Sequence, residues 1–229
     1  MSAYIELNHI SKGFYNKTVL NDVSLTVEQG QTVGLVGANG SGKSVLFKII
    51  CGFLRPDSGK VFVRGKELGK DRDFPENMGL FINSPGFVGI YSGFQNLKYL
   101  ADIQGKIGDE EIRSAMGKVG LDPDNKTKVD AYSLGMKQKL GIAQAIMENQ
   151  DIIVLDEPFN ALDFRTYGDI KDIIRMLKAE GKTILLISHN YSDIDQLCDE
   201  VFTIEDHTLV RVTEDMAARF REANGEIRS

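Results

Sequence analysis

The segment "TVGLVGANGSGKSVLFKIICGFL", residues 32–54, constrains the fold of this chain more than any other. A short apolar run ends at Gly37, and a helix-type apolar run follows Ser44. The eight residues between these points, "GANGSGKS", fit the pattern G-x-x-x-x-G-K-[ST]. In that pattern backbone N–H groups curl around phosphate oxygens, the lysine (Lys43) reaches the β- and γ-phosphates, and the serine hydroxyl (Ser44) serves Mg²⁺. The segment therefore predicts a strand, a phosphate loop and a helix; the alternative is a glycine-rich turn.

A pair of acids ends a second buried-type strand, "DIIVLDEP", residues 151–158. Ligands of open α/β sheets bind at the carboxyl ends of the strands, where Asp156 and Glu157 are expected to emerge. Asp156 is predicted to hold Mg²⁺ together with Ser44 or through water. Glu157 is predicted to polarise an attacking water. The alternative is two solvated acids in a turn before Pro158.

The remaining patterns predict an α/β fold. Apolar strands such as "TILLISH", residues 183–189, are separated by helical patterns, which is typical of a parallel sheet covered on both faces. Residues 84–150 contain helical spacing and no long strand pattern, which predicts a helical insert. Further predictions are half-buried strands over 4–11 and 23–28, a strand or hairpin over 59–68, a helix over 164–181, and a polar tail that frays over 217–229.

Composition excludes several classes of protein. The net charge of −6 and the pI of about 5.2 disfavour sequence-independent nucleic-acid binding, which needs clustered Lys and Arg. Two distant cysteines, Cys51 and Cys198, form neither a disulfide framework nor a metal motif. No signal peptide and no run approaching about 18 apolar residues is evident, so we expect a soluble chain.

Five motifs in order give the chain a resemblance to the nucleotide-binding domain of ATP-binding-cassette (ABC) transporters, over about residues 4–212. They are "GANGSGKS", "YSLGMKQ" (132–138), "IIVLDEP", "NALD" (160–163) and "LISH" (186–189). The resemblance implies a single α/β domain over 1–229 with an ABC-type phosphate-loop ATPase core. A small antiparallel β subdomain and the core are expected in 1–83 and 151–212, an inserted α-helical subdomain in 84–150, and a tail in 213–229.

The resemblance also implies roles for particular residues. In the family two domains pair head to tail, so Ser133 and the backbone N–H of Gly135, at a helix expected from about Met136, contact the γ-phosphate in trans. Asp163 links the two sites across the dimer. The implied catalytic residues are Glu157, His189 and Lys43. The implied metal ligands are Ser44, Asp156 and Asn83. The other implied ATP-binding residues are Gly37, Ala38, Asn39, Gly40, Ser41, Gly42, Val45 and one of Phe14 and Tyr15, which stacks on adenine.

Two departures from the family pattern stand out. In "YSLGMKQ" the first signature glycine is Leu134 and the final glutamine is Met136, a variant that resembles bacterial drug- and peptide-antibiotic exporters. Asn83 stands where the family usually has glutamine, and its carbonyl oxygen is one methylene shorter. Asn83 is therefore either a weaker metal ligand or a plain loop asparagine.

The resemblance predicts an ATP-hydrolysing subunit that uses ATP and Mg²⁺ and drives a separate membrane permease at the cytoplasmic face of the membrane. Export of drugs, peptides or antibiotics is favoured, and the second nucleotide-binding domain is a copy of this chain or a close relative. Phe87, Tyr91 and Phe94 either contact the permease or fill the helical subdomain's own core. The alternatives are a non-transport or binding-only ABC ATPase, and a phosphate-loop kinase or GTPase, which would lack the signature and the terminal histidine.

Overall fold

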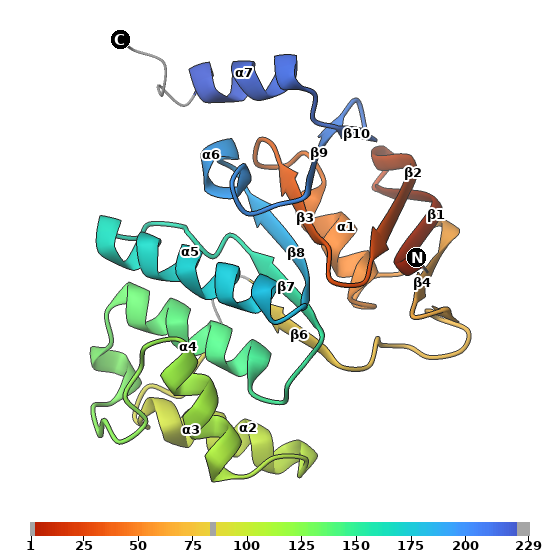
Figure 1. Cartoon of the computed structure of the whole chain (residues 1–229). Coiled ribbons are helices and arrows are strands. Elements are labelled where there is room, and N and C mark those ends of the chain that lie inside the picture. The colour runs from red at the N-terminus through yellow and green to blue at the C-terminus, as the bar shows by residue number, and fades with distance from the viewer. Residues whose placement is uncertain (1–2, 83–85, 224–229) are drawn as a thin grey trace. The chain divides into compact units, whose positions relative to one another are not determined.

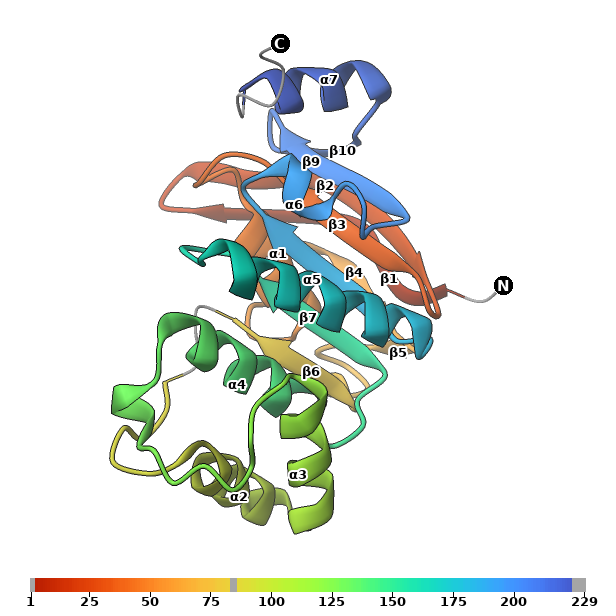
Figure 2. The ribbon, with the colours of Figure 1, turned by 60° about the vertical axis from the view of Figure 1, so that its left-hand side comes forward.

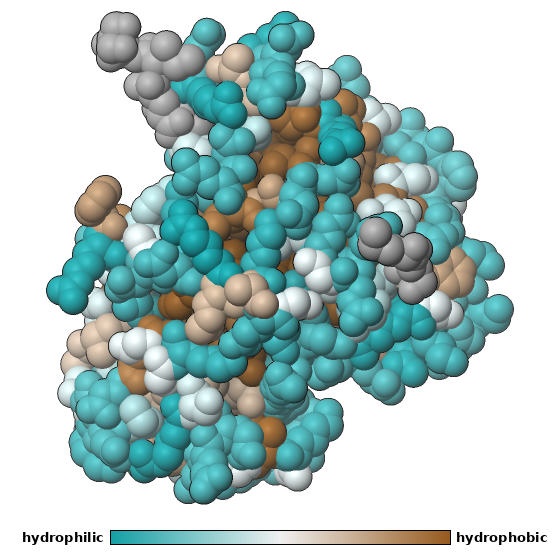
Figure 3. Space-filling model, viewed as in Figure 1, coloured by the Kyte–Doolittle hydropathy of each residue, from teal (hydrophilic) through white to brown (hydrophobic). Residues whose placement is uncertain are grey.

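The computed structural model describes residues 3–82 and 86–223 and divides the chain into two compact units (Figure 1). Unit 1 comprises Met1–Glu76 and Thr183–Ser229, and unit 2 comprises Asn77–Lys182. Each unit is described separately. On the face shown in Figure 3 hydrophilic residues cover most of the surface, as expected when apolar side chains fill the interior.

Unit 1 begins with an antiparallel sheet in the order β2-β1-β4-β5. Alternation of apolar and polar residues places Ile5, Leu7, Val23 and Val27 in the core, which confirms the two predicted N-terminal strands. The predicted hairpin over 59–68 is also present. The strands are β1 (Ala3–Phe14), β2 (Lys17–Glu28), β4 (Ser58–Val63) and β5 (Lys66–Glu67).

The second sheet of unit 1 has a parallel centre. Strand β3 (Thr32–Val36) lies between β8 (Thr183–Ser188) and β9 (Glu200–Glu205), parallel to both, and β10 (Thr208–Arg211) pairs with β9 in the antiparallel sense. Every residue of β3 and β8 is buried, as their continuous apolar runs predict. Helix α1 (Lys43–Ile50) follows β3, and α6 (Tyr191–Ile194) follows β8.

The C-terminal segment is helical, so the expectation that it frays is wrong for its described part. Helix α7 (Glu214–Ala223) packs on α6. Phe220 stacks on Tyr191 with ring centroids 5.7 Å apart, and Arg221 Nη2 pairs with Asp195 Oδ2 at 2.8 Å. Burial, and next the hydrogen bond with Asp195, raise the pKa of Tyr191 to about 12. The tail looked unstructured because its few apolar residues meet their partners only in the folded chain.

Unit 2 combines a pair of parallel strands with helices. Strand β6 (Met78–Phe81) pairs with β7 (Ile152–Asp156), and α4 packs on both. Helices α2, α3 and α4 lie side by side in Figures 1 and 2, as the helical spacing in 84–150 predicts. The helices are α2 (Gly93–Gln104), α3 (Asp109–Lys118), η1 (Val129–Ala131), α4 (Leu134–Ile146) and α5 (Phe164–Ala179).

Helix α5 confirms the amphipathic pattern over 164–181. Its buried residues are Ile170, Ile173, Ile174 and Leu177, and Gly181 follows it with a φ of 76°, the left-handed conformation that stops helices. Within the described residues, no helix is both long enough and apolar enough to cross a membrane.

Candidate functional site

The phosphate loop of unit 1 has the conformation that its glycines predict. Gly37, Gly40 and Gly42 have φ values of 140°, 84° and 109°, and Gly42 is the N-cap of α1. Lys43 is only 5% exposed, and its ammonium donates to Gly37 O at 2.6 Å and to Ala38 O at 2.9 Å. The cation therefore lies inside the curl of the loop, at the positive end of a helix, where an anion is stabilised.

Other loop side chains are also suited to a polyphosphate. Ser41 Oγ is buried and has no hydrogen-bond partner among the described residues, so it is an unsatisfied polar atom at the loop. Ala38, Asn39 and Gly40 are exposed at the tip, and Ser44 is exposed in the first turn of α1. Val45 is half-buried in the same turn.

Strand register places His189 at the same sheet edge as the phosphate loop. Val36, the last residue of β3, is in register with Ser188, the last residue of its parallel neighbour β8. Gly37 and His189 come directly after these two residues, so both emerge at the carboxyl edge of the sheet. His189 is exposed. Below it, Ser188 Oγ donates to Asp193 Oδ2 at 2.7 Å and accepts from Asn190 N at 3.1 Å, which orders the turn that carries the histidine.

Phe14 and Tyr15 lie at the end of the β1–β2 hairpin. Tyr15 and Asn16 form its two-residue turn with φ values of 47° and 63°, the left-handed pair of a type I′ turn. Phe14 is 40% exposed, whereas Tyr15 is completely exposed. Both line a hollow of about 600 Å³ that also includes Lys17 and Asp57.

The acid pair of unit 2 stands at the end of β7. Asp156 is 4% exposed, and Glu157, which is half-buried, has a φ of 54°. A glutamate with left-handed backbone angles is rare, and this conformation turns the chain sharply directly after Asp156. Phe81 of β6 is in register with Leu155 of β7, so the chain after β6 leaves at this same edge. Asn83 lies in that stretch and outside the described residues.

The signature segment is the capped start of a helix. Helix α4 begins at Leu134, two residues before the expected start, because Ser133 Oγ accepts a hydrogen bond from Met136 N at 3.2 Å and caps it. Ser133 is exposed, as a contact in trans requires, and Leu134 is 43% exposed. Gly135 is buried.

Thr166, which no sequence motif singled out, connects two of the predicted residues of unit 2. Asp163 caps α5 by accepting from Thr166 N at 3.0 Å and from Thr166 Oγ1 at 2.7 Å. These bonds, the backbone N–H first, lower the pKa of the Asp163 carboxyl. A Cβ added at Gly135 would lie 2.5 Å from Thr166 Cγ2. Thr166, 31 positions later in the chain, thus leaves no room for a side chain at Gly135, and no local sequence pattern could have indicated this.

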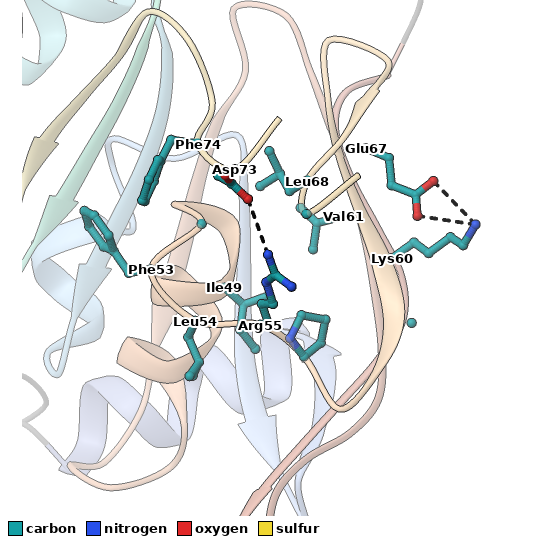
Figure 4. Close-up of a pocket in the computed structure, with 14 residues that line it drawn as sticks. Ile49, Phe53, Leu54, Arg55, Lys60, Val61, Glu67, Leu68, Asp73 and Phe74 are labelled. Carbon is teal, nitrogen blue, oxygen red and sulfur yellow. Dashed lines mark hydrogen bonds and ion pairs between the residues drawn. The ribbon is translucent and has the colours of Figure 1, made fainter. Parts of the chain in front are cut away.

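A second hollow of unit 1, of about 570 Å³, lies between the end of α1 and the β4–β5 hairpin (Figure 4). Phe53 and Phe74 are more than half exposed beside it, with ring centroids 6.0 Å apart. Arg55 pairs with Asp73 at 3.4 Å. None of the predicted nucleotide-binding residues lines this hollow, so it is separate from the phosphate loop.

Comparison with known proteins gives a consistent result. A family model described as "ABC transporter" matches residues 20–160. An uncharacterized ABC transporter ATP-binding protein of Bacillus subtilis (strain 168), YybJ, is 42% identical over 195 residues, which cover 85% of this chain and 89% of YybJ. The lantibiotic transport ATP-binding protein SrtF of Streptococcus pyogenes is 33% identical, covering 85% of this chain and 84% of SrtF. The bacitracin transport ATP-binding protein BcrA of Enterococcus faecalis is 34% identical over a region that covers 92% of this chain and 69% of BcrA.

Solved structures share the fold. CbiO1 of Clostridium perfringens, part of the ABC transporter complex cbiONQ, superposes with a TM-score of 0.83 at 21% identity, covering 97% of this chain and 96% of cbiO1. An ATP-binding cassette of an ABC transporter in its ADP conformation gives a TM-score of 0.82 at 22% identity, covering 96% of this chain and 94% of the cassette. The predicted fold class, an α/β phosphate-loop ATPase core with an antiparallel sheet and a group of helices, is confirmed.

Proposed function

Because this chain is a member of the ABC transporter family and is the subunit that binds and hydrolyses ATP, we propose that its phosphate loop, Glu157 and His189 form half of a composite ATP site. The other half comes from Ser133 and Gly135 of a second nucleotide-binding domain, either a copy of this chain or a close relative. A two-fold pair of such chains has two equivalent sites.

The observation that carries this proposal is the phosphate loop itself. Its buried ammonium already lies inside the curl of the loop, 2.6 Å from Gly37 O, and the adjacent parallel strand delivers His189 to the same edge. Supporting evidence in unit 2 is the exposed serine cap at the start of α4. A helix N-terminus with an exposed hydroxyl is suited to an anionic oxygen from another chain.

The chemistry follows from these positions. Loop N–H groups and Lys43 hold the β- and γ-phosphates, and Phe14 stacks on the adenine. Glu157 accepts a proton from a water whose oxygen attacks the γ-phosphorus; the bond from that phosphorus to the β–γ bridging oxygen breaks, and ADP and phosphate leave. His189 and the partner's signature stabilise charge on the transferring group.

Magnesium is the implied metal of this reaction. Ser44 and Asp156 would hold it through oxygen atoms, the ligands that Mg²⁺ prefers, with phosphate oxygens completing the coordination. Mg²⁺ would neutralise charge on the phosphates. Asn83 remains a further candidate ligand. The described residues contain no cluster of three His, Cys, Asp or Glu side chains suited to a metal ion.

The partner is a membrane permease on a separate chain, and the subunit works at the cytoplasmic face of the membrane. The relatives named for lantibiotic and bacitracin transport favour export of peptide antibiotics or similar compounds. For the contact with the permease we propose the segment that holds Phe87, Tyr91 and Phe94. All three rings are partly exposed, and the neighbouring Val88 and Ile90 are 51% and 62% exposed.

Light scattering of a Glu157→Gln variant with and without Mg-ATP tests the proposal. ATP is expected to bind without turnover and to convert the monomer to a dimer. Ser133→Arg in the same background is expected to abolish the dimer, whereas Ser114→Arg, at an exposed position of α3, leaves it intact. A dimer that tolerates Ser133→Arg would contradict the composite site. An ATP-bound protein that stays monomeric would contradict a site built from two copies of this chain.

A further inference from the structure

Asp57, in the loop between α1 and β4, ties down the end of β1. Its Oδ1 accepts from Lys12 Nζ at 2.5 Å, and its Oδ2 accepts from the backbone N–H of Gly13 at 2.8 Å. A third bond runs from Asp57 N to Ser11 O at 2.9 Å. Three consecutive residues of β1 are therefore held by one residue from a distant loop, and Phe14 is the next residue along the strand.

Lys12 transmits this tether to the Phe14 ring. Its side chain is only 14% exposed, and its ammonium lies over the ring, 5.4 Å from the centroid. At this distance a cation is attracted to the face of an aromatic ring. Asp57 thus holds the strand directly and, through the Lys12 ammonium, one face of the Phe14 ring. Phe14 still has 40% of its surface exposed.

The β1–β2 hairpin connects the tethered ring to the phosphate loop. The hollow that Phe14 lines also includes Lys17, Thr18 and Asp57. Directly after Thr18, Val19 Cγ1 lies 3.2 Å from where a Cβ of Gly42 would stand. The start of β2, directly after the hairpin turn, therefore contacts the phosphate loop within unit 1.

We propose that Asp57 is a positioning residue for the nucleotide base: through Lys12 and Gly13 it presets the Phe14 ring to stack on a purine. The inference rests on the proposed function. It also distinguishes the two candidate aromatics, because Phe14 is anchored whereas Tyr15 is fully exposed in the turn. A ring held in place before binding loses less conformational entropy when the base arrives.

The test compares two probes by calorimetry, Mg-ATP and inorganic tripolyphosphate with Mg²⁺. Asp57→Asn is expected to weaken ATP binding about three- to fivefold, the upper part of the range for an exposed ion pair, and to leave tripolyphosphate binding unchanged. Lys12→Met should have the same selective effect. Asp73→Asn, which removes an exposed ion pair with Arg55 in the same unit, serves as the matched control and should change neither affinity.

A double-mutant cycle closes the test. In a Phe14→Ala background Asp57→Asn is expected to cause no further loss of ATP affinity, because its effect passes through the ring. Three outcomes would each overturn the inference without contradicting the proposed ATP site. They are equal losses of affinity for ATP and tripolyphosphate in Asp57→Asn, an unchanged ATP affinity in that variant, and an additive loss of ATP affinity in the Phe14→Ala background. Wild-type protein that binds neither probe would overturn the proposed function and this inference together.

Discussion

Gly79 of β6 lies where helix α4 approaches the strand most closely, and it provides the sharpest prediction about unit 2. A Cβ added at this position would stand 1.7 Å from Ala145 O and 2.7 Å from Ala145 C, both backbone atoms of α4. Ordinary contact begins near 3.4 Å, so the helix backbone would have to retreat by about 1.7 Å (3.4 minus 1.7). A helix held by its own hydrogen bonds cannot yield as a flexible side-chain end can.

Gly79→Ala is therefore expected to cost about 3 kcal/mol or more, at or beyond the upper end for overpacked cores. In urea this corresponds to a fall of about 1 M in the unfolding midpoint of the protein. Because α4 carries Ser133 and Gly135 at its start, the same displacement should lower the ATPase rate. Circular dichroism during urea titration and a phosphate-release assay measure the two effects.

Gly168→Ala is the matched control. This glycine lies inside α5 of the same unit, and a Cβ there would meet no atom within 4 Å. The substitution should stabilise the protein by about 0.5–1 kcal/mol, because alanine loses less backbone entropy than glycine in a helix. If Gly79→Ala shifted the midpoint no more than Gly168→Ala, the close contact between β6 and α4 would be refuted.

Three further predictions follow from the hydrogen bonds and contacts described above. Gly135→Ala places a Cβ against Thr166 and should slow ATP hydrolysis about a hundredfold, the cost of an ångström-scale misplacement. Adding Thr166→Ala should restore the ATPase activity. A double variant that stays inactive would contradict the steric explanation. Because the pKa of Asp163 is lowered by folding, its contribution to stability is present above about pH 4 and is lost as the pH falls through the folded-state pKa. The difference in free energy of unfolding between the wild type and Asp163→Asn should therefore shrink below about pH 4, as measured by denaturant unfolding at a series of pH values. Arg221→Ala removes the pair with Asp195 and should speed amide exchange in α7. Unchanged exchange would mean that the pair does not hold the helix.

Several features were readable from the sequence because they depend on neighbours in the chain. The phosphate loop follows from glycines that accept positive φ between an apolar strand and a helix, and a helix start was predicted close behind Ser133, at about Met136. Asp156 and Glu157 stand at the end of β7, and His189 directly follows β8, because the apolar runs that form these two strands end there. The motif order was sufficient to identify the family, which the comparisons confirm.

Other features depended on contacts between distant residues. Asp57 reaches Gly13 across 44 positions, Thr166 requires the glycine at 135, and Gly79 leaves room for Ala145. The C-terminal helix was missed because its weak apolar pattern gains an anchor only when Phe220 meets Tyr191.

The sequence by itself therefore determined the family of the chain and at which strand or helix ends the predicted ATP-site groups stand. Short patterns encode backbone conformation, caps and burial, and these fix local chemistry. Only the tertiary structure decided which residues hold those groups in position, Asp57 behind Phe14 and Thr166 against Gly135 among them. The physical reason is that such contacts arise when separate segments pack, and no sequence period records which segments will meet.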